Sequence, residues 1–173
     1  MRVRPEREDD FAQIDAVVRA AFEESGDAVA LLVRRTRADG NAVPEGSLVA
    51  LDGSAVIGYL QLSWVGLEGG SRDRILDLGP LGVRPDRQGR GVGRALVEAQ
   101  IAVVERLGEP MLMVEGIPSL YPRFGFERGD SLGFTKPHDS IPDAAFMVRR
   151  FAGYTPDLAG RVRYPAAFDH LPY

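Results

Sequence analysis

Apolar side chains recur every three or four residues in two early segments, and this spacing predicts two amphipathic helices. The first runs from a cap at Asp9 or Asp10 to about residue 23, and the second from Asp27 to about Arg37. A short strand over residues 2–4 precedes them. The apolar faces contain Phe11, Ile14, Val17, Val18, Ala21 and Phe22 in the first helix, and Ala28, Leu31 and Leu32 in the second.

Longer apolar runs farther along the chain predict strands. Residues 47–51 and 55–65 flank Asp52-Gly53, a dipeptide typical of tight hairpin turns, and a turn over 41–46 leads into them. Further strands are predicted over 74–83, 111–114, 125–128 and 145–151.

The longest predicted helix runs from Gly91 to about Leu107, and residues 118–124 predict a short one. Because a helix joins the strands at 74–83 and 111–114, these two should pair in parallel, whereas the hairpin strands pair antiparallel. The order predicts an α/β (mixed α+β) fold with a mixed sheet, in one domain over residues 1–173. Residues 154–173 are expected to pack on it as a C-terminal tail. The apolar face of this longest predicted helix contains Val92, Leu96, Ala99, Val103 and Leu107.

A glycine-alternating loop lies between the strand at 74–83 and the longest helix. Glycines at 89, 91 and 93 allow the backbone to approach a ligand closely, because a Cβ there would stand in the way. The loop also leads into a helix N-terminus, where free N–H groups and the helix dipole favour an anion. The pattern therefore predicts a phosphate site.

Two common glycine-rich phosphate loops do not fit this segment. A Walker loop needs Lys-Ser/Thr after its last glycine, but Arg94-Ala95 follows Gly93. A dinucleotide fingerprint needs G-x-G-x-x-G, but the loop has G-x-G-x-G.

Gln88-x-x-Gly91-x-Gly93 fits the Q/R-x-x-G-x-G/A loop that cradles the pyrophosphate of acetyl-coenzyme A (acetyl-CoA) in GNAT acetyltransferases. The segment from Tyr121 to Phe126 resembles Y-x-x-L/F-G-F of the same superfamily. Residues 142–148 and 160–168 resemble its YhbS-like branch of predicted N-acetyltransferases. The resemblance spans nearly the whole chain.

The resemblance implies the GNAT fold, with a mostly antiparallel mixed sheet flanked by helices and acetyl-CoA as co-substrate. Strands 74–83 and 111–114 would splay apart, and the pantetheine arm would enter the gap and pair with the backbone of 81–83. The implied cofactor-binding residues are Leu81, Gly82, Val83, Gln88, Gly89, Arg90, Gly91, Val92, Gly93 and Arg94.

Acetyl transfer to an amine needs a neutral amine, a donor for the carbonyl oxygen and a proton for the leaving thiolate. By resemblance, Tyr121 lies near the cofactor sulfur and acts as the acid, although a core tyrosine at a helix start would look the same. Asp77 is the candidate base, because some GNAT enzymes place a catalytic glutamate at that offset and apolar neighbours would raise its pKa. An edge residue paired with Arg72 or Arg74 is the alternative, and Glu115 is the reserve candidate.

Composition narrows the function. The chain has 21 Lys and Arg against 25 Asp and Glu, so its net charge of −4 disfavours general nucleic-acid binding. Arg84, Arg87, Arg90 and Arg94 nevertheless cluster at the loop and would suit phosphates. With no cysteine and only two histidines, neither a metal nor an acyl-cysteine intermediate is expected. The chain shows no signal peptide and no membrane span, so a cytoplasmic protein is expected.

Several alternatives stay open. Residues 129–133 match the G-x-S-x-G elbow of serine hydrolases, but no convincing helix follows them. The fold would also serve a non-catalytic acyl-CoA sensor or scaffold. By resemblance the acceptor site involves residues 22–46 and 129–143. The acceptor itself is open between a small-molecule amine, an amino sugar and a peptide or protein amine, and a homodimer is compatible with the family.

Overall fold

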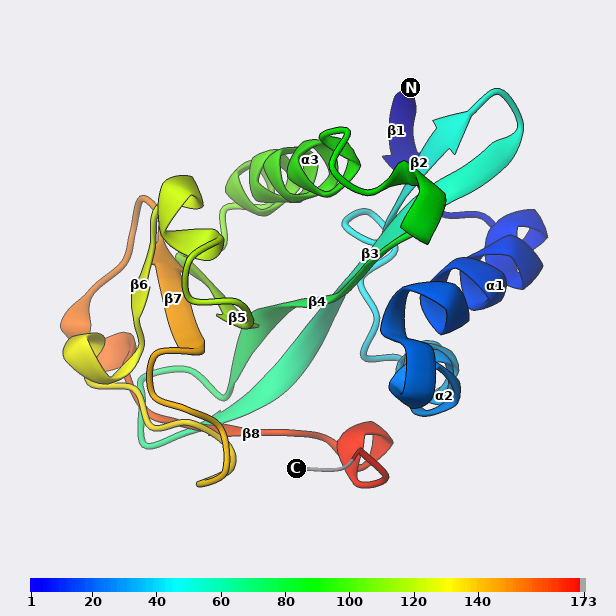
Figure 1. Cartoon of the computed structure of the whole chain (residues 1–173). Coiled ribbons are helices and arrows are strands. Elements are labelled where there is room, and N and C mark those ends of the chain that lie inside the picture. Colours follow the sequence, from blue (N-terminus) through cyan, green and yellow to red (C-terminus); the bar gives the residue numbers. More distant parts are fainter. Residues whose placement is uncertain (172–173) are drawn as a thin grey trace. The chain divides into compact units, whose positions relative to one another are not determined.

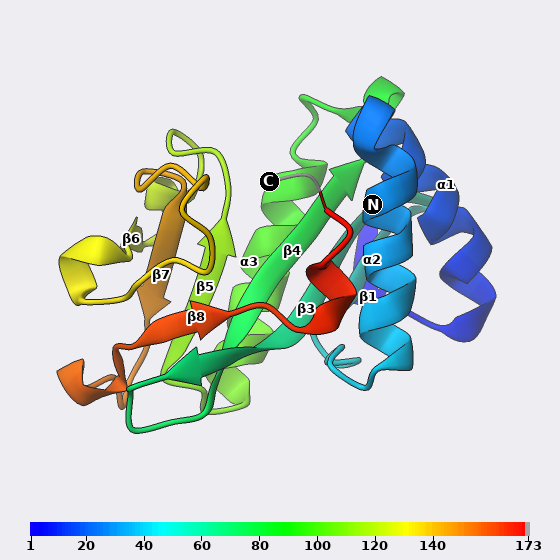
Figure 2. The ribbon, with the colours of Figure 1, turned by 90° about the horizontal axis from the view of Figure 1, so that it is seen from below.

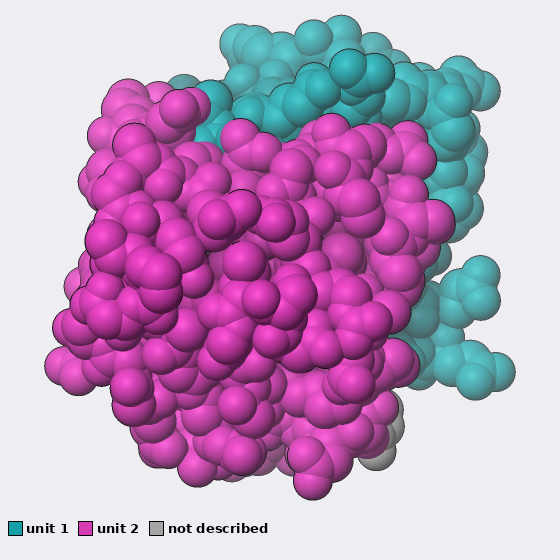
Figure 3. Space-filling view, turned by 90° about the vertical axis from the view of Figure 1, so that its left-hand side faces the viewer, with its two compact units in different colours: residues 1–63, 79–103 teal, residues 64–78, 104–173 magenta. Residues whose placement is uncertain are grey.

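The computed structural model describes residues 1–171 of the chain and divides it into two compact units (Figure 3). Unit 1 contains Met1–Ser63 and Gly79–Val103. Unit 2 contains Trp64–Leu78 and the chain from Val104 onward. Two long strands, β3 (Ala55–Glu68) and β4 (Arg74–Val83), contribute to both units (Figure 1).

Unit 1 combines antiparallel strands with helices. β1 (Arg2–Pro5) pairs with β2 (Leu48–Asp52), and β2 pairs with β3 across the predicted hairpin turn. The helices of unit 1 are α1 (Phe11–Phe22), α2 (Gly26–Ala38) and most of α3 (Val92–Arg106), whose residues from Val104 onward belong to unit 2.

Glycines in the strands of unit 1 allow helices to approach closely. A Cβ added to Gly58 of β3 would lie 2.8 Å from Val92 of α3, and one added to Gly82 of β4 would lie 3.3 Å from Ala21 of α1. A core cluster lies between α1, α2 and strands β2 and β3, and burial of such apolar area is the main stabilising contribution. Its fully buried members include Ile14, Val18, Ala30, Val33, Val49 and Tyr59.

Unit 2 contains parts of β3 and β4 together with the remaining strands, in the order β3-β4-β5-β7-β6, with β8 beside β3 (Figures 1 and 2). β4 pairs in parallel with β5 (Met111–Glu115) through Leu76–Leu112 and Asp77–Met113, as the helical connection predicts. β7 (Phe146–Arg150) pairs antiparallel with both β5 and β6 (Phe126–Arg128). The predicted mixed, mostly antiparallel sheet is confirmed.

Seven short 3-10 helices complete the fold over residues 1–171, and two of them matter for the site: η4 (Tyr121–Phe124) and η7 (Ala166–Phe168). The others are η1 (Glu8–Asp10), η2 (Glu23–Ser25), η3 (Pro85–Arg87), η5 (Asp130–Leu132) and η6 (Pro156–Leu158).

Four local predictions need correction. Asp10 is the N-cap residue of α1, as predicted, but its side chain makes no capping hydrogen bond, because its carboxylate binds Arg4 at 2.7 Å and accepts from the Arg7 N–H. Residues 118–124 form only the 3-10 turn η4, where Pro122 follows Tyr121. Leu107 lies beyond α3 and is 41% exposed.

The fourth local prediction that needs correction concerns the C-terminal tail. It does not simply pack on the surface, because its residues Arg161–Arg163 form β8 and pair antiparallel with the end of β3 (Figure 2). Val162 of this strand is fully buried. The last part of the predicted tail, residues 172–173, lies outside the described residues.

Candidate active-site residues

The glycine loop of unit 1 has the geometry of an anion site. Gly89 and Gly91 have φ angles of +69° and +81°, which L side chains rarely adopt. A Cβ at either position would meet no atom within 4 Å, so the space above the loop is open. The amide of Gln88 closes the loop by donating to the Val83 carbonyl at 3.1 Å.

The loop ends at the start of α3, whose first N–H groups have no acceptor within the helix. The Gly91 carbonyl accepts a helical hydrogen bond from the Ala95 N–H at 3.0 Å. The positive end of the helix dipole is therefore directed toward the same open space. A phosphate fits these residues because every requirement of an anion site is present in one short segment.

The four arginines near the loop differ in their partners. Arg84 binds Asp86 at 2.7 Å, Arg87 binds Asp52 at 2.8 Å, and Arg94 binds Glu98 at 2.8 Å. Arg90 has no ion pair within residues 1–171. The sequence alone did not distinguish them, since their acidic partners come from a neighbouring turn and from the next turn of the helix.

Unit 2 brings three ionisable groups of the sequence prediction together. Asp77 is 5% exposed on β4 and pairs through its backbone with β5, which ends at Glu115. Burial raises the pKa of Asp77 well above its usual value, and the negative charge of Glu115 raises it further. The charge of Asp77 in turn acts on Tyr121.

Asp77 is therefore a buried carboxyl group with a perturbed pKa, as expected for a functional residue. The alternative of an exposed edge residue paired with Arg72 or Arg74 is wrong. Arg72 binds Glu109 at 2.7 Å, and Arg74 stacks over the Trp64 ring at 4.0 Å.

Tyr121 is held by its aromatic and backbone neighbours. Its ring is 5% exposed, packs edge-on against Phe126 with centroids 5.6 Å apart, and occupies the space that a Cβ at Gly116 would need. Arg149 of β7 donates to the Phe124 carbonyl and so fixes the end of η4. Burial, followed by the charge of Asp77, raises the Tyr121 pKa to about 12. The hydroxyl therefore keeps its proton at neutral pH.

Glu115 differs from Asp77 because it is exposed at the end of β5. Protein atoms around the carboxylate still remove part of its hydration, and this raises its pKa, while a hydrogen bond from Tyr164 and the nearby His138 oppose the shift. The Tyr164 hydroxyl donates to Glu115 Oε2 at 2.9 Å. Sequence reasoning missed Tyr164, because 49 residues separate it from Glu115 and only the pairing of β8 with β3 brings the tail back.

The G-x-S-x-G match does not form a nucleophile elbow. Residues 130–132 form the 3-10 helix η5, and the Ser131 hydroxyl donates to the Arg128 carbonyl at 2.7 Å. Asp130 is engaged by Arg128. An elbow requires a strand, a strained turn and a helix with an exposed hydroxyl, so this match has no structural basis.

Replacing Asp77 with Asn should stabilise the protein at high pH more than at low pH. The pKa of Asp77 is raised in the folded state, so the folded chain keeps a proton that the unfolded chain releases above about pH 4. The free energy of unfolding therefore falls as pH rises toward the raised pKa, and the asparagine side chain of the variant does not contribute this fall.

We expect the Tm difference between D77N and the wild type to grow by at least about 2 °C from pH 4 to pH 8, measured by calorimetry. Asp73→Asn, at an exposed position just before β4, is the matched control and should show no such trend. A constant difference for D77N would contradict the raised pKa.

Within residues 1–171, no group of three or more His, Asp or Glu side chains is arranged to hold a metal ion. None of the helices in that range is long and apolar enough to cross a membrane.

Proteins that share this fold and much of this sequence are acetyltransferases of the GNAT class. Residues 44–128 match the model of the acetyltransferase (GNAT) domain family. The chain is also 35% identical to the N-acetyltransferase YhbS of Escherichia coli K12, over 99% of this chain and 100% of that one. The chain therefore belongs to the GNAT acetyltransferase family.

Two solved structures support the assignment. A structure of E. coli YhbS in complex with CoA matches with a TM-score of 0.88 and 32% identity, covering 99% of this chain and 93% of that one. A GNAT family acetyltransferase from Brucella melitensis in complex with acetyl-CoA matches with a TM-score of 0.78 and 32% identity, covering 97% of both chains.

Proposed function

We propose that the protein is an N-acetyltransferase that moves the acetyl group of acetyl-CoA to a primary amine by direct attack in a ternary complex. The observation that carries this proposal is the open glycine loop at the N-terminus of α3, in a chain whose relatives of similar length hold CoA or acetyl-CoA. The acceptor is a small-molecule amine or a peptide amine.

In this proposal the loop binds the pyrophosphate. Backbone N–H groups of Gly89 to Arg94 donate to the phosphate oxygens, and Arg90 adds a charge that no acidic side chain among residues 1–171 neutralises. The remaining proposed loop residues are Gln88, which fixes the loop, and Val92, which anchors α3 on the sheet of unit 1. Backbone groups of Leu81, Gly82 and Val83, at the end of β4, pair with the pantetheine arm.

In the proposed reaction the amine nitrogen loses two protons, and a C–N bond replaces the C–S bond of the thioester. A carboxylate takes one proton from the ammonium, and the neutral nitrogen attacks the thioester carbon. The C–S bond then breaks, the nitrogen releases its second proton to solvent, and the departing thiolate takes a proton from solvent. Tyr121 donates a hydrogen bond to this sulfur and keeps its proton. The Tyr121 pKa of about 12 lies above that of a thiol, so complete transfer of its proton to the thiolate is unfavourable. Tyr121 therefore stabilises the developing thiolate by donating a hydrogen bond.

Asp77 is the proposed base, and Glu115 is the alternative. Burial and the raised pKa support Asp77, whereas exposure at a strand end supports Glu115. The acidic limb of kcat/KM against pH distinguishes them. If Asp77 is the base, the limb lies well above the usual carboxyl range and disappears in D77N. If Glu115 is the base, the limb survives in D77N and disappears in E115Q.

Calorimetric titration with acetyl-CoA, with NAD as the control, tests the proposal first. We expect saturable one-to-one binding of acetyl-CoA alone, followed by thiol release with at least one member of an amine panel. Binding without transfer to any amine would favour the acyl-CoA sensor. Failure to bind acetyl-CoA would overturn both functions.

A further inference from the structure

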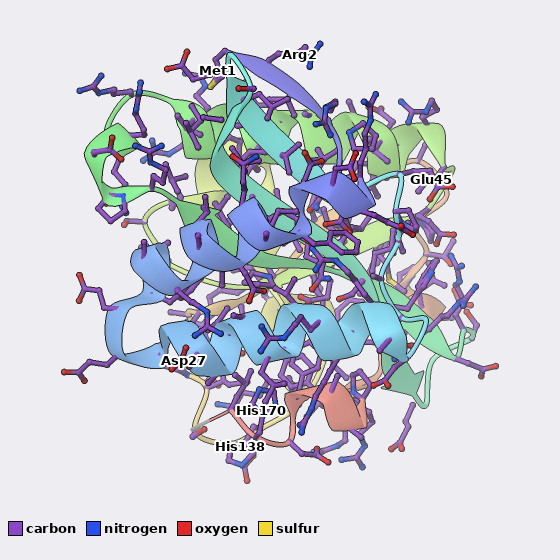
Figure 4. The ribbon with its side chains drawn as sticks, turned by 90° about the vertical axis from the view of Figure 1, so that its right-hand side faces the viewer. Met1, Arg2, Asp27, Glu45, His138 and His170 are labelled. Carbon is purple, nitrogen blue, oxygen red and sulfur yellow. The ribbon has the colours of Figure 1, made fainter. Side chains whose placement is uncertain are left out.

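Unit 2 contains a pocket of about 440 Å³ next to the C-terminal segment. Figure 4 shows His138 close to η7, the short helix of the C-terminal segment. The lining residues are Pro137, His138, Arg163, Tyr164, Phe168 and Asp169. A volume of this size suits a small molecule rather than a folded partner.

The C-terminal segment builds one wall of this pocket. β8 pairs with the end of β3 through Gly66–Arg163 and Leu67–Val162, and this pairing fixes where the chain continues. The rings of Tyr164 and Phe168 then stack, with centroids 4.3 Å apart and planes inclined by 9°. The wall is therefore flat, aromatic and fixed by packing.

The guanidinium in the pocket lining is already paired, so the carboxylates at and near the pocket can attract a cation. The guanidinium of Arg163 is paired with Glu68 at 2.9 Å, and His138 Nδ1 lies 2.7 Å from the Ser140 hydroxyl. Asp169 adds a carboxylate to the lining.

Glu115 does not line the pocket itself, but two lining residues connect it to the pocket. The Tyr164 hydroxyl donates to its carboxylate at 2.9 Å, and His138 is near enough to act on it electrostatically. Neither Glu115 nor Asp169 has an ion-pair partner in the part of the chain that the structure describes.

We propose that this pocket binds the acetyl acceptor, and that the acceptor is a small primary amine with a flat apolar body. The body lies against the Tyr164–Phe168 wall, and the ammonium binds beside Glu115. This inference rests on the proposed acetyltransferase function and names its substrate class.

The position of Glu115 connects the pocket to the proposed reacting groups. Its charge acts on Asp77, and the charge of Asp77 acts on Tyr121. Asp77 pairs in register with Met113 of β5, two residues before Glu115, so an ammonium bound beside Glu115 lies at the end of the strand that carries one candidate base and pairs with the strand of the other. Tyr164 acts here as a positioning residue, since it orients Glu115.

The test uses the full chain with phenethylamine as the probe and 2-phenylethanol as its neutral counterpart. We expect phenethylamine to bind at least about tenfold more tightly than the alcohol, measured by NMR titration without acetyl-CoA. E115Q should remove most of this difference. Glu127→Gln is the matched control, because Glu127 is an exposed strand carboxylate paired with Arg150 outside the pocket.

Tyr164→Phe keeps the ring and removes the hydrogen bond to Glu115. We expect it to raise KM for phenethylamine about three- to tenfold while kcat and KM for acetyl-CoA change little, with Tm as a check on folding. If Tyr164 had only a structural role, its replacement would change kcat, both KM values and Tm together, or would change none of them.

The outcomes separate the two proposals. Equal binding of amine and alcohol, or wild-type binding by E115Q, overturns the pocket even if acetyl-CoA binds and a peptide lysine is acetylated. In that case the proposed function stands. If phenethylamine binds but acetyl-CoA does not, the proposed function fails and the acceptor role fails with it.

Discussion

Replacing Tyr121 with Phe should lower kcat about ten- to a thousandfold while acetyl-CoA binds nearly as it does to the wild type. The ring makes the packing contacts with Phe126 and Gly116, and Phe keeps these contacts. Only the hydroxyl is lost, and with it the proposed hydrogen bond to the leaving thiolate. Steady-state thiol release gives kcat, and calorimetry gives the affinity for acetyl-CoA.

Tyr154→Phe is the control for this prediction, because it removes a phenol from the same unit at a position that the mechanism does not use. We expect wild-type kcat for that variant. A wild-type kcat for Tyr121→Phe would exclude Tyr121 from the chemistry and leave it as a core residue of η4.

The second large effect is expected at Gly91, where alanine should weaken acetyl-CoA binding at least about tenfold. Gly91 has a φ of +81°, so alanine strains the backbone by roughly 1–2 kcal/mol, and the loop relaxes away from the conformation that presents its N–H groups. The new Cβ also enters the open space proposed for phosphate.

Gly93→Ala is the matched variant in the same loop. A Cβ there lies 3.7 Å from Leu81 and Val83, which is ordinary contact, and Gly93 is not among the glycines with positive φ. We therefore expect binding within about threefold of the wild type. Equal losses in both variants would mean that flexibility of the loop, rather than the conformation of Gly91, governs binding.

Sequence predicts a functional site best where the groups that form the site are close together in the chain. The spacing of Gly89, Gly91 and Gly93 predicts a phosphate loop because its ligands are consecutive backbone groups. The structure supplies the positive φ angles and the open space that this interpretation needs at Gly89 and Gly91. The roles of Tyr121 and Asp77 stay predictions, although both lie where burial changes their pKa.

Elements with strong periodicity were likewise predictable. The hairpin at Asp52 and the helix α3 follow from local preferences and from one apolar face. Both ends of α3 lie within one residue of the prediction, whereas β3 runs three residues beyond its predicted end, to Glu68. Residues 118–124 were harder because a short segment offers little periodic signal. Only the 3-10 helix η4 forms there, with Tyr121 and Phe124 buried.

The family, the order of strands and helices, and the candidate phosphate loop are all predictable from the sequence, since they depend on residues close together in the chain. The pairing of the charges, the depth at which Asp77 is buried and the contact of Tyr164 with Glu115 became visible in the folded chain alone. Electrostatic environment and pocket shape arise from contacts between distant segments. The pairing of β8 with β3 is such a contact, and it turned a predicted surface tail into the wall of a pocket.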